Sequence, residues 1–182
     1  MVVRVVERKA IAVIPAQFGY LTLDKNGQVI ASDSVIEDTT VPMISGVKGG
    51  NILLGDMVTD KPIVQAVDYL RALDDDTFKQ IAEINIGDPN NMMAYTVSCI
   101  QIRLGDGEDL KSKADLTASM LKDLPKSQGN VQYIDVNPSS PFIKTDKVTV
   151  QPKSNKSKSD TSQSEKKDTS KQSANVSKSK QD

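Results

Sequence analysis

Residues 19–30, "GYLTLDKNGQVI", are the stretch that most constrains the fold of this chain. Two short strand-like runs flank the pair Asn26-Gly27, which supplies the positive φ values of a tight turn, so the stretch predicts a β-hairpin. The β-branched run before it, "VVRVVERKAIAVI" at positions 2–14, would leave its backbone N–H and C=O groups unpaired if it stood alone. The N-terminal part of the chain therefore needs neighbouring strands.

Two segments carry one apolar stripe each at helical spacing. In residues 61–73 the apolar positions fall at offsets 0, 3, 4, 7 and 10, and Pro62 suits the first turn of a helix. In residues 108–124 the positions of the second stripe recur every three or four residues. The sequence predicts two amphipathic helices, each covering one face of a sheet. Their stripes consist of Ile63, Ala66, Val67, Leu70 and Leu73, and of Leu110, Ala114, Thr117, Leu121 and Leu124.

The segment between these helices is strand-like. It has turn residues at positions 87–91, and its apolar phase changes parity near Ser98 and Cys99, where we expect a second turn. The resulting order is strands, helix, strands, helix and strand, which predicts an α+β fold with a mostly antiparallel sheet. The last strand is expected at residues 131–136, with 141–144 and 148–150 as further edge segments.

The charges divide the chain into an acidic body and a basic tail. Residues 1–150 hold 15 Lys and Arg against 20 Asp and Glu, net −5, whereas residues 151–182 hold 8 against 4, net +4. The tail has nine serines and no aromatic residue, so it cannot bury enough surface to offset chain entropy, and we expect disorder. Because its charges alternate in sign and no ring is available for base stacking, we expect no binding to nucleic acid.

The residue types argue for a binding module rather than an enzyme. The chain has no histidine, which excludes His-dependent triads and the commonest metal ligand. Its single cysteine, Cys99, excludes an internal disulfide, and without a histidine to activate it we expect a small buried apolar residue. A hydrolase built on two distant carboxylates stays open, although nothing points to one. We therefore expect no catalytic residue, no cofactor and no metal.

Two polar patterns have ordinary structural interpretations. The glycine-rich stretch "GVKGG" at 46–50 lacks the frame of a phosphate-binding loop. The acidic groups at 74–76 and 106–109 lack the alternating oxygen ligands and the closing glutamate of a calcium loop, so we assign them to a helix end and a helix N-terminus. No window approaches the about 18 consecutive apolar residues of a membrane span.

Several motifs, taken in order, resemble the extracytoplasmic part of the FtsQ/DivIB family of bacterial cell-division proteins. Residues 2–14 are similar to the family strand V-x-V-x-ER-x-P-x-A that closes its POTRA domain, with Ala10 in place of the usual proline. Residues 19–30 are similar to its hairpin G-x-Y-x-L-x-D-x-x-G-x-V, and "VPMISG" to its element L-P-x-I-x-G. The strand and helix "IQIRLGDGEDLKSKADLTASML" and the strand "YIDV" also match, so that the resemblance spans residues 2 to about 145.

The resemblance implies a non-enzymatic scaffold of the division machinery. Such a protein binds FtsB/DivIC-like and FtsL-like proteins at the extracytoplasmic face of the cell membrane, and it helps control septum formation and septal peptidoglycan synthesis. We expect membrane association only through an N-terminal anchor that this sequence does not contain. The expected domains are a POTRA remnant at residues 1–14, a β domain at 15–146 and a disordered Lys/Ser-rich tail at 147–182.

The resemblance also places the partner site. In the family the partner adds as a strand to the exposed edge formed by the last strands. In an alternative interpretation two residues of this region have structural roles: Tyr133 belongs to the core, and Phe142 packs over the end of the sheet. Carried over by position, the expected contact residues are Tyr133, Asn137, Pro138, Ser140, Phe142 and Ile143.

Two other functions remain as alternatives at this point. The first is a different cell-envelope binding module, such as a peptidoglycan or polymer adaptor, that acts through the basic tail. The second and more distant one is a metal-dependent hydrolase. Deletion of residues 151–182 separates the first from the division scaffold, and a metal-content assay tests the second.

Overall fold

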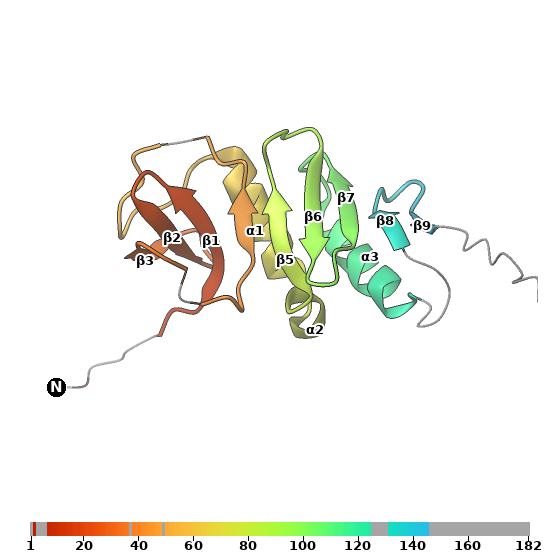
Figure 1. Cartoon of the computed structure of the whole chain (residues 1–182), viewed down its shortest axis with the longest axis horizontal. Helices are drawn as coiled ribbons and strands as arrows, with labels where there is room; N and C mark the ends of the chain where they lie inside the picture. The colour runs from red at the N-terminus through yellow and green to blue at the C-terminus, as the bar shows by residue number, and fades with distance from the viewer. Residues whose placement is uncertain (1, 3–6, 37, 49, 125–130, 146–182) are drawn as a thin grey trace, which may run out of the picture. The chain divides into compact units, whose positions relative to one another are not determined.

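The computed structural model describes residues 2, 7–36, 38–48, 50–124 and 131–145. The expected tail at 147–182 and the expected segment at 148–150 lie outside these residues. The described part contains nine strands in one sheet and three helices (Figure 1). Their bounds are β1 Ala10–Ala16, β2 Gly19–Asp24, β3 Val29–Asp33, β4 Met43–Ser45, α1 Lys61–Ala72, α2 Asp75–Phe78, β5 Ile81–Asn85, β6 Met92–Thr96, β7 Gln101–Gly105, α3 Leu110–Lys122, β8 Val131–Asp135 and β9 Phe142–Thr145.

The strands follow the order β3-β2-β1-β4-β5-β6-β7-β8-β9. Five neighbouring pairs are antiparallel, which confirms the expected α+β fold with a mostly antiparallel sheet. The pairs β1–β4, β4–β5 and β7–β8 are parallel. Helix α1 lies in the connection from β4 to β5, and α3 in the connection from β7 to β8. A helical crossover returns the chain to the end of the sheet where it started, so the two joined strands run in the same direction.

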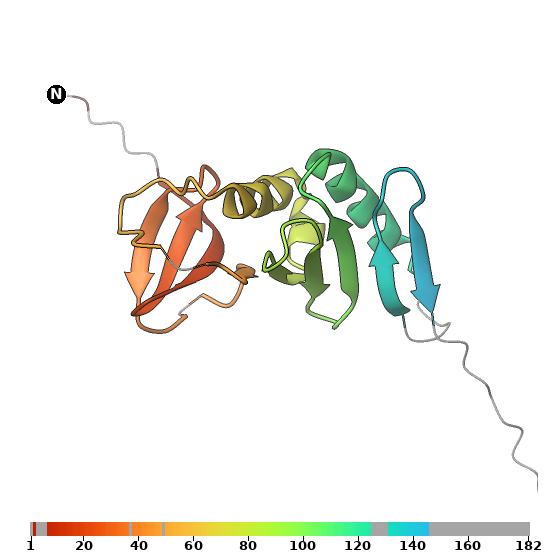
Figure 2. The same ribbon diagram turned by 90° about the horizontal axis from the view of Figure 1, so that it is seen from above.

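Helices α1 and α3 pack against each other on the same face of the sheet (Figure 2). Their contact contains a buried hydrogen bond between Tyr69 Oη and Thr117 Oγ1, 2.8 Å apart. Burial raises the pKa of Tyr69, so its hydroxyl stays neutral. The apolar row formed by Ile84, Ala94 and Ile102 continues to Ile134 on β8, and all four are fully buried. This one-sided burial forms the core.

Most local predictions are confirmed. The hairpin is β2 and β3; Gly27 has the expected positive φ, 79°, whereas Asn26 does not have one. Strand β6 ends at Thr96 and β7 begins at Gln101, which confirms a turn at Ser98 and Cys99. Residues 10–14 of the N-terminal β-branched run lie in β1, which pairs with β2 and β4.

Two local expectations need correction. Cys99 is exposed rather than buried, because it lies in the turn with a φ of 62° and has left the apolar phase of the strands. The acidic group at 74–76 does not only end a helix: Asp74 begins the short helix α2, and its side chain accepts a hydrogen bond from Thr77 N at 2.7 Å. Helix α2 is too short to show an apolar period in the sequence.

Gly46 allows β4 and the segment after β5 to approach each other closely. Its φ is +77°, and a Cβ there would lie 2.4 Å from Gly87 N and 2.7 Å from Gly87 Cα. Gly55 also has a positive φ, +92°, but a Cβ there would meet nothing within 4 Å. A side chain at Gly46 would cause both backbone strain and a steric clash, whereas a side chain at Gly55 would cause backbone strain alone.

We expect Gly46→Ala to lower the free energy of unfolding by about 2–4 kcal/mol, because strain and the clash with Gly87 add. Gly55→Ala, which has the strain alone, should cost about 1 kcal/mol. Urea unfolding of both variants measures the difference. Equal losses would contradict the proposed close approach.

Asp24 organises the turn of the β2–β3 hairpin from a buried position. Its Oδ1 accepts hydrogen bonds from Asn26 N at 2.8 Å and Gln28 N at 2.9 Å, and Arg8 donates to Oδ2. Burial raises the pKa of Asp24, but the hydrogen bonds from Gln28, Asn26 and Arg8 together lower it below its ordinary value of 3.8. The charged form is therefore favoured in the folded state.

A depressed carboxyl pKa stabilises the fold above the ordinary value and loses this effect as the pH falls through the folded-state pKa. We expect Asp24→Asn to be less stable than wild type by about 1 kcal/mol at pH 7. The difference should shrink below pH 3.8. Urea unfolding across this range tests it, with Asp115→Asn on the exposed side of α3 as the control for charge. A difference that does not change with pH would contradict this role.

Candidate partner-binding site

Strand β9 is the last strand of the described sheet and pairs only with β8 there. In an antiparallel pair, alternate residues direct their N–H and C=O groups away from the partner strand. The outer side of β9 therefore presents unpaired backbone groups in the described part of the chain. Such an edge is a template for one more strand.

The structure brings all six expected contact residues into one hairpin at this edge. Asn137, Pro138 and Ser140 form the connection between the two strands, and Ile143 pairs with Ile134 across them. Their role in binding stays a prediction. The residues by element are Tyr133 on β8, Asn137, Pro138 and Ser140 in the connection, and Phe142 and Ile143 on β9.

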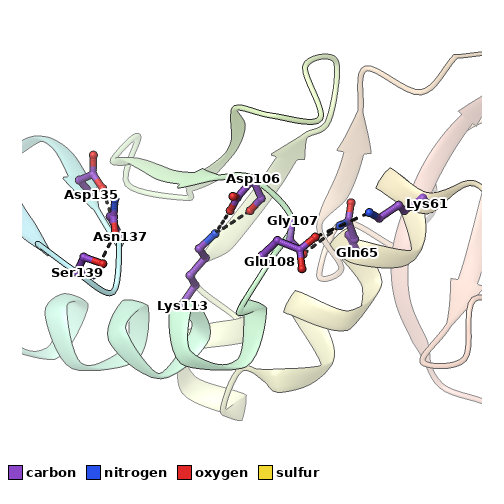
Figure 3. Close-up of polar contacts among 9 residues, drawn as sticks. All are labelled: Lys61, Gln65, Asp106, Gly107, Glu108, Lys113, Asp135, Asn137 and Ser139. Atoms are coloured by element: carbon purple, nitrogen blue, oxygen red, sulfur yellow. Dashed lines mark hydrogen bonds and ion pairs between the residues drawn. The ribbon is translucent and has the colours of Figure 1, made fainter.

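The β8–β9 connection is held by its own hydrogen bonds. Asn137 N donates to Asp135 Oδ1, Ser139 N donates to Asn137 Oδ1, and Ser140 N donates to Asn137 O, each at 3.0 Å. Figure 3 shows Asp135, Asn137 and Ser139 in this arrangement. Asx-type bonds of this kind fix a turn locally. The register of β9, and with it the orientation of the free edge, follows from the turn.

The side chains of β9 point alternately to the two faces of the sheet. Phe142 lies on the face without helices, 45% exposed, and its ring meets that of Tyr133 edge-on with centroids 5.7 Å apart. Ile143 lies on the helix-covered face, half-buried against the core. Tyr133 is also half-buried but is not a member of the core. A partner strand would thus meet one aromatic and one aliphatic side chain.

Two cations beside Tyr133 were missed from the sequence. The Arg103 guanidinium lies over the ring, 3.7 Å from its centroid, and Lys144 Nζ lies 5.5 Å from it. Arg103 comes from β7, 30 positions earlier in the chain, and only the parallel pairing of β7 with β8 places it here. The only signal in the sequence was its position among the alternating polar and apolar residues of "IQIRL". The Arg103, Tyr133, Phe142 and Lys144 side chains are called the aromatic–cation strip below.

A polar hollow of about 430 Å³ lies beside the β8–β9 connection and the loop that precedes α3. At its wall Lys113 Nζ, on a buried side chain, donates to both Asp106 O and Asp106 Oδ1 at 2.7 Å (Figure 3). The hydrogen bond and the charge of Lys113 lower the pKa of Asp106. The buried amine is thus already used to fix the loop.

The same loop is also tied to α1. Gln65 Nε2 donates to Gly107 O at 3.0 Å, and Lys61 Nζ lies 3.8 Å from Glu108 Oε1 (Figure 3). Within the described ranges, no group of three or more His, Cys, Asp or Glu residues is placed to hold a metal ion. The polar contacts at this hollow therefore hold the loop before α3 in place beside the β8–β9 hairpin.

Comparison with protein-family models decides the family. The model "Cell division protein FtsQ/DivIB, C-terminal" matches residues 12–137. The chain belongs to the FtsQ/DivIB family. This confirms the resemblance, and with it a role in cell division as a component of the divisome at the septum, together with other division proteins. The match includes Tyr133 and Asn137 but ends before β9.

Comparison with solved structures finds the major extracytoplasmic domain of the trans isomer of the cell-division protein DivIB from Geobacillus stearothermophilus. The identity is 15% and the TM-score 0.44, over 66% of this chain and 99% of that one. No curated protein matches the chain. Among the described residues of this FtsQ/DivIB domain, no helix is long and apolar enough to cross a membrane.

The contact between Arg103 and Tyr133 predicts a measurable coupling. We expect Arg103→Met and Tyr133→Leu each to lower the free energy of unfolding, and the double variant to lose less than the sum by about 0.5–2 kcal/mol, the value of a cation–π contact. Urea unfolding of the four proteins gives this coupling energy. Arg71→Met, whose arginine pairs with Asp68 on α1, should add to Tyr133→Leu without coupling. Additive losses for Arg103→Met would contradict the contact.

Proposed function

We propose that this FtsQ/DivIB domain is a non-enzymatic scaffold that binds FtsB/DivIC-like and FtsL-like division proteins through the free edge of β9. By holding these partners it helps control septum formation and septal peptidoglycan synthesis. The observation that carries the proposal is the outer side of β9, which pairs with no other strand of the described residues and is flanked by Phe142 on one face of the sheet and Ile143 on the other.

Strand addition suits this edge for two physical reasons. Main-chain hydrogen bonds from an added strand satisfy the outward N–H and C=O groups of β9 and provide affinity without regard to sequence. Side chains then provide selection, because alternate partner residues meet Phe142 on the open face and Ile143 beside the core. Exposed aromatic side chains at such a place are typical energetic anchors of an interface.

We also propose the place and the organisation of the protein. The domain acts at the extracytoplasmic face of the cell membrane at the division septum, held by an N-terminal membrane anchor. Residues 1–14 correspond to the end of a POTRA domain, 15–146 to the β domain and 147–182 to a Lys/Ser-rich tail. Strand β1 crosses the first of these boundaries, since it spans Ala10–Ala16 and pairs with β2.

The charge of the site is compatible with protein partners. The chain as a whole has a formal net charge of −1, and residues 1–150 are acidic. The edge itself carries an aromatic pair and two cations, which together form an amphipathic strip rather than a polar cleft. Mixed aromatic and arginine surfaces are enriched at protein interfaces. A strand edge with such side chains supports binding rather than catalysis.

The central test replaces Phe142. We expect Phe142→Asp to weaken binding of purified DivIC-like and FtsL-like ectodomains by about tenfold or more, because it removes an anchor and places a carboxylate at the interface. Calorimetry or a quantitative pull-down measures the loss. Phe18→Asp is the matched control, since Phe18 is 87% exposed and lies between β1 and β2, far from β9 in the strand order.

Two further measurements complete this test. Ile143→Asp should also weaken binding, and circular dichroism must show that this half-buried position still permits folding. Deletion of residues 151–182 should leave binding intact. Unaltered binding by Phe142→Asp would reject the edge, and complete loss on deletion of the tail would favour an adaptor that acts through its basic residues.

A further inference from the structure

The aromatic–cation strip contains two cations, and one carboxylate lies beside it. Arg103 and Lys144 both lie against the Tyr133 ring, and neither forms an ion pair with any residue in the described part of the chain. Asp135 faces Arg103 across the β7–β8 ladder, but its Oδ1 accepts a hydrogen bond from Asn137 N. Arg103, Lys144 and Asp135 together have a net charge of +1, and Asp135 lies directly opposite Arg103, so Lys144 at the edge is the cation with no carboxylate directly opposite it in the described sheet.

Lys144 is the cation of the strip that a partner strand would reach. It lies on β9 at the free edge, is exposed, and pairs with Tyr133 on its inner side. The same row of the open face continues inward through Gln101 and Tyr95 to Glu83, whose carboxylate accepts a hydrogen bond from Ser45. Strands are spaced about 4.8 Å apart, so Glu83 lies about 19 Å away and cannot neutralise Lys144.

We infer that the partner strand carries a carboxylate directly opposite Lys144. Two residues further along the partner strand, on the same face, lies an apolar side chain opposite Phe142. The residue between these two points to the other face and is also apolar, opposite Ile143. The recognised segment is therefore an extended Asp/Glu–apolar–apolar triplet. This inference rests on the proposed function and adds the chemistry of the partner to it.

The reason lies in the geometry of cross-strand pairs. Side chains directly opposite each other on neighbouring strands have Cβ atoms about 5 Å apart, where opposite charges attract and like charges repel. A lysine on an edge strand also disfavours pairing with unsuitable chains. Lys144 thus admits a strand with a carboxylate at this position and opposes one with a lysine or arginine there. Arg103, three strand spacings from such a partner, instead positions Tyr133 beneath Lys144 and Phe142.

The test varies the charge of Lys144 against the DivIC-like and FtsL-like ectodomains as probes. We expect Lys144→Glu to raise the Kd about tenfold, because an attraction becomes a repulsion, and Lys144→Arg to leave it unchanged. Lys144→Gln should reduce the dependence of the Kd on NaCl concentration, since salt screens an exposed charge pair. Lys79→Glu, at the exposed end of α2, makes the same change in net charge and should have no effect.

A charge exchange identifies the opposite residue. Each Asp or Glu in the bound partner segment is replaced by lysine, and one of these partner variants should restore the binding of Lys144→Glu to within about threefold of wild type. An unchanged Kd for Lys144→Glu, together with lost binding by Phe142→Asp, would overturn the inference and leave the proposed function standing. Unaltered binding by Phe142→Asp, or no binding by wild type, would overturn both.

Discussion

The burial of one apolar row under two helices is the constraint on which the rest of this structure depends. Ile84, Ala94, Ile102 and Ile134 lie side by side across four strands with no exposed surface, and α1 and α3 cover them. The Tyr69–Thr117 hydrogen bond joins the two helices within this layer. Because both helices lie on one face, the opposite face is left for side chains that can contact other molecules (Figure 2).

The same constraint explains the position of the candidate site. Helix α3 connects β7 to a parallel β8. The turn after β8, which is held by its own hydrogen bonds, then places β9 antiparallel to β8. From β5 onward each strand pairs with the one before it, and β9 is the last in the described sheet. Its side chain Ile143 packs against the core, while its outer backbone groups have no partner strand in the described sheet. In the described sheet the edge is therefore open, as strand addition requires.

Local chemistry explains which expectations were confirmed. The Asn-Gly turn, the two apolar stripes and the parity change near Cys99 each act within a few residues, and each led to the correct element. The exposure of Cys99 and the short helix after Asp74 were missed, because a turn side chain and a single helical turn have no period. The family resemblance placed the six contact candidates in one region, and the structure groups them in one hairpin.

The sequence by itself determined the strand and helix types, the acidic body, the absence of histidine chemistry and the family. These depend on residue type and short spacing. Only the tertiary structure decided which strands pair in parallel, and that Arg103 lies over Tyr133 although 30 positions separate them. Such neighbours are set by helical crossovers and by strand register, in which a shift of one residue exchanges the two faces. The partner chemistry inferred at Lys144 follows from that register.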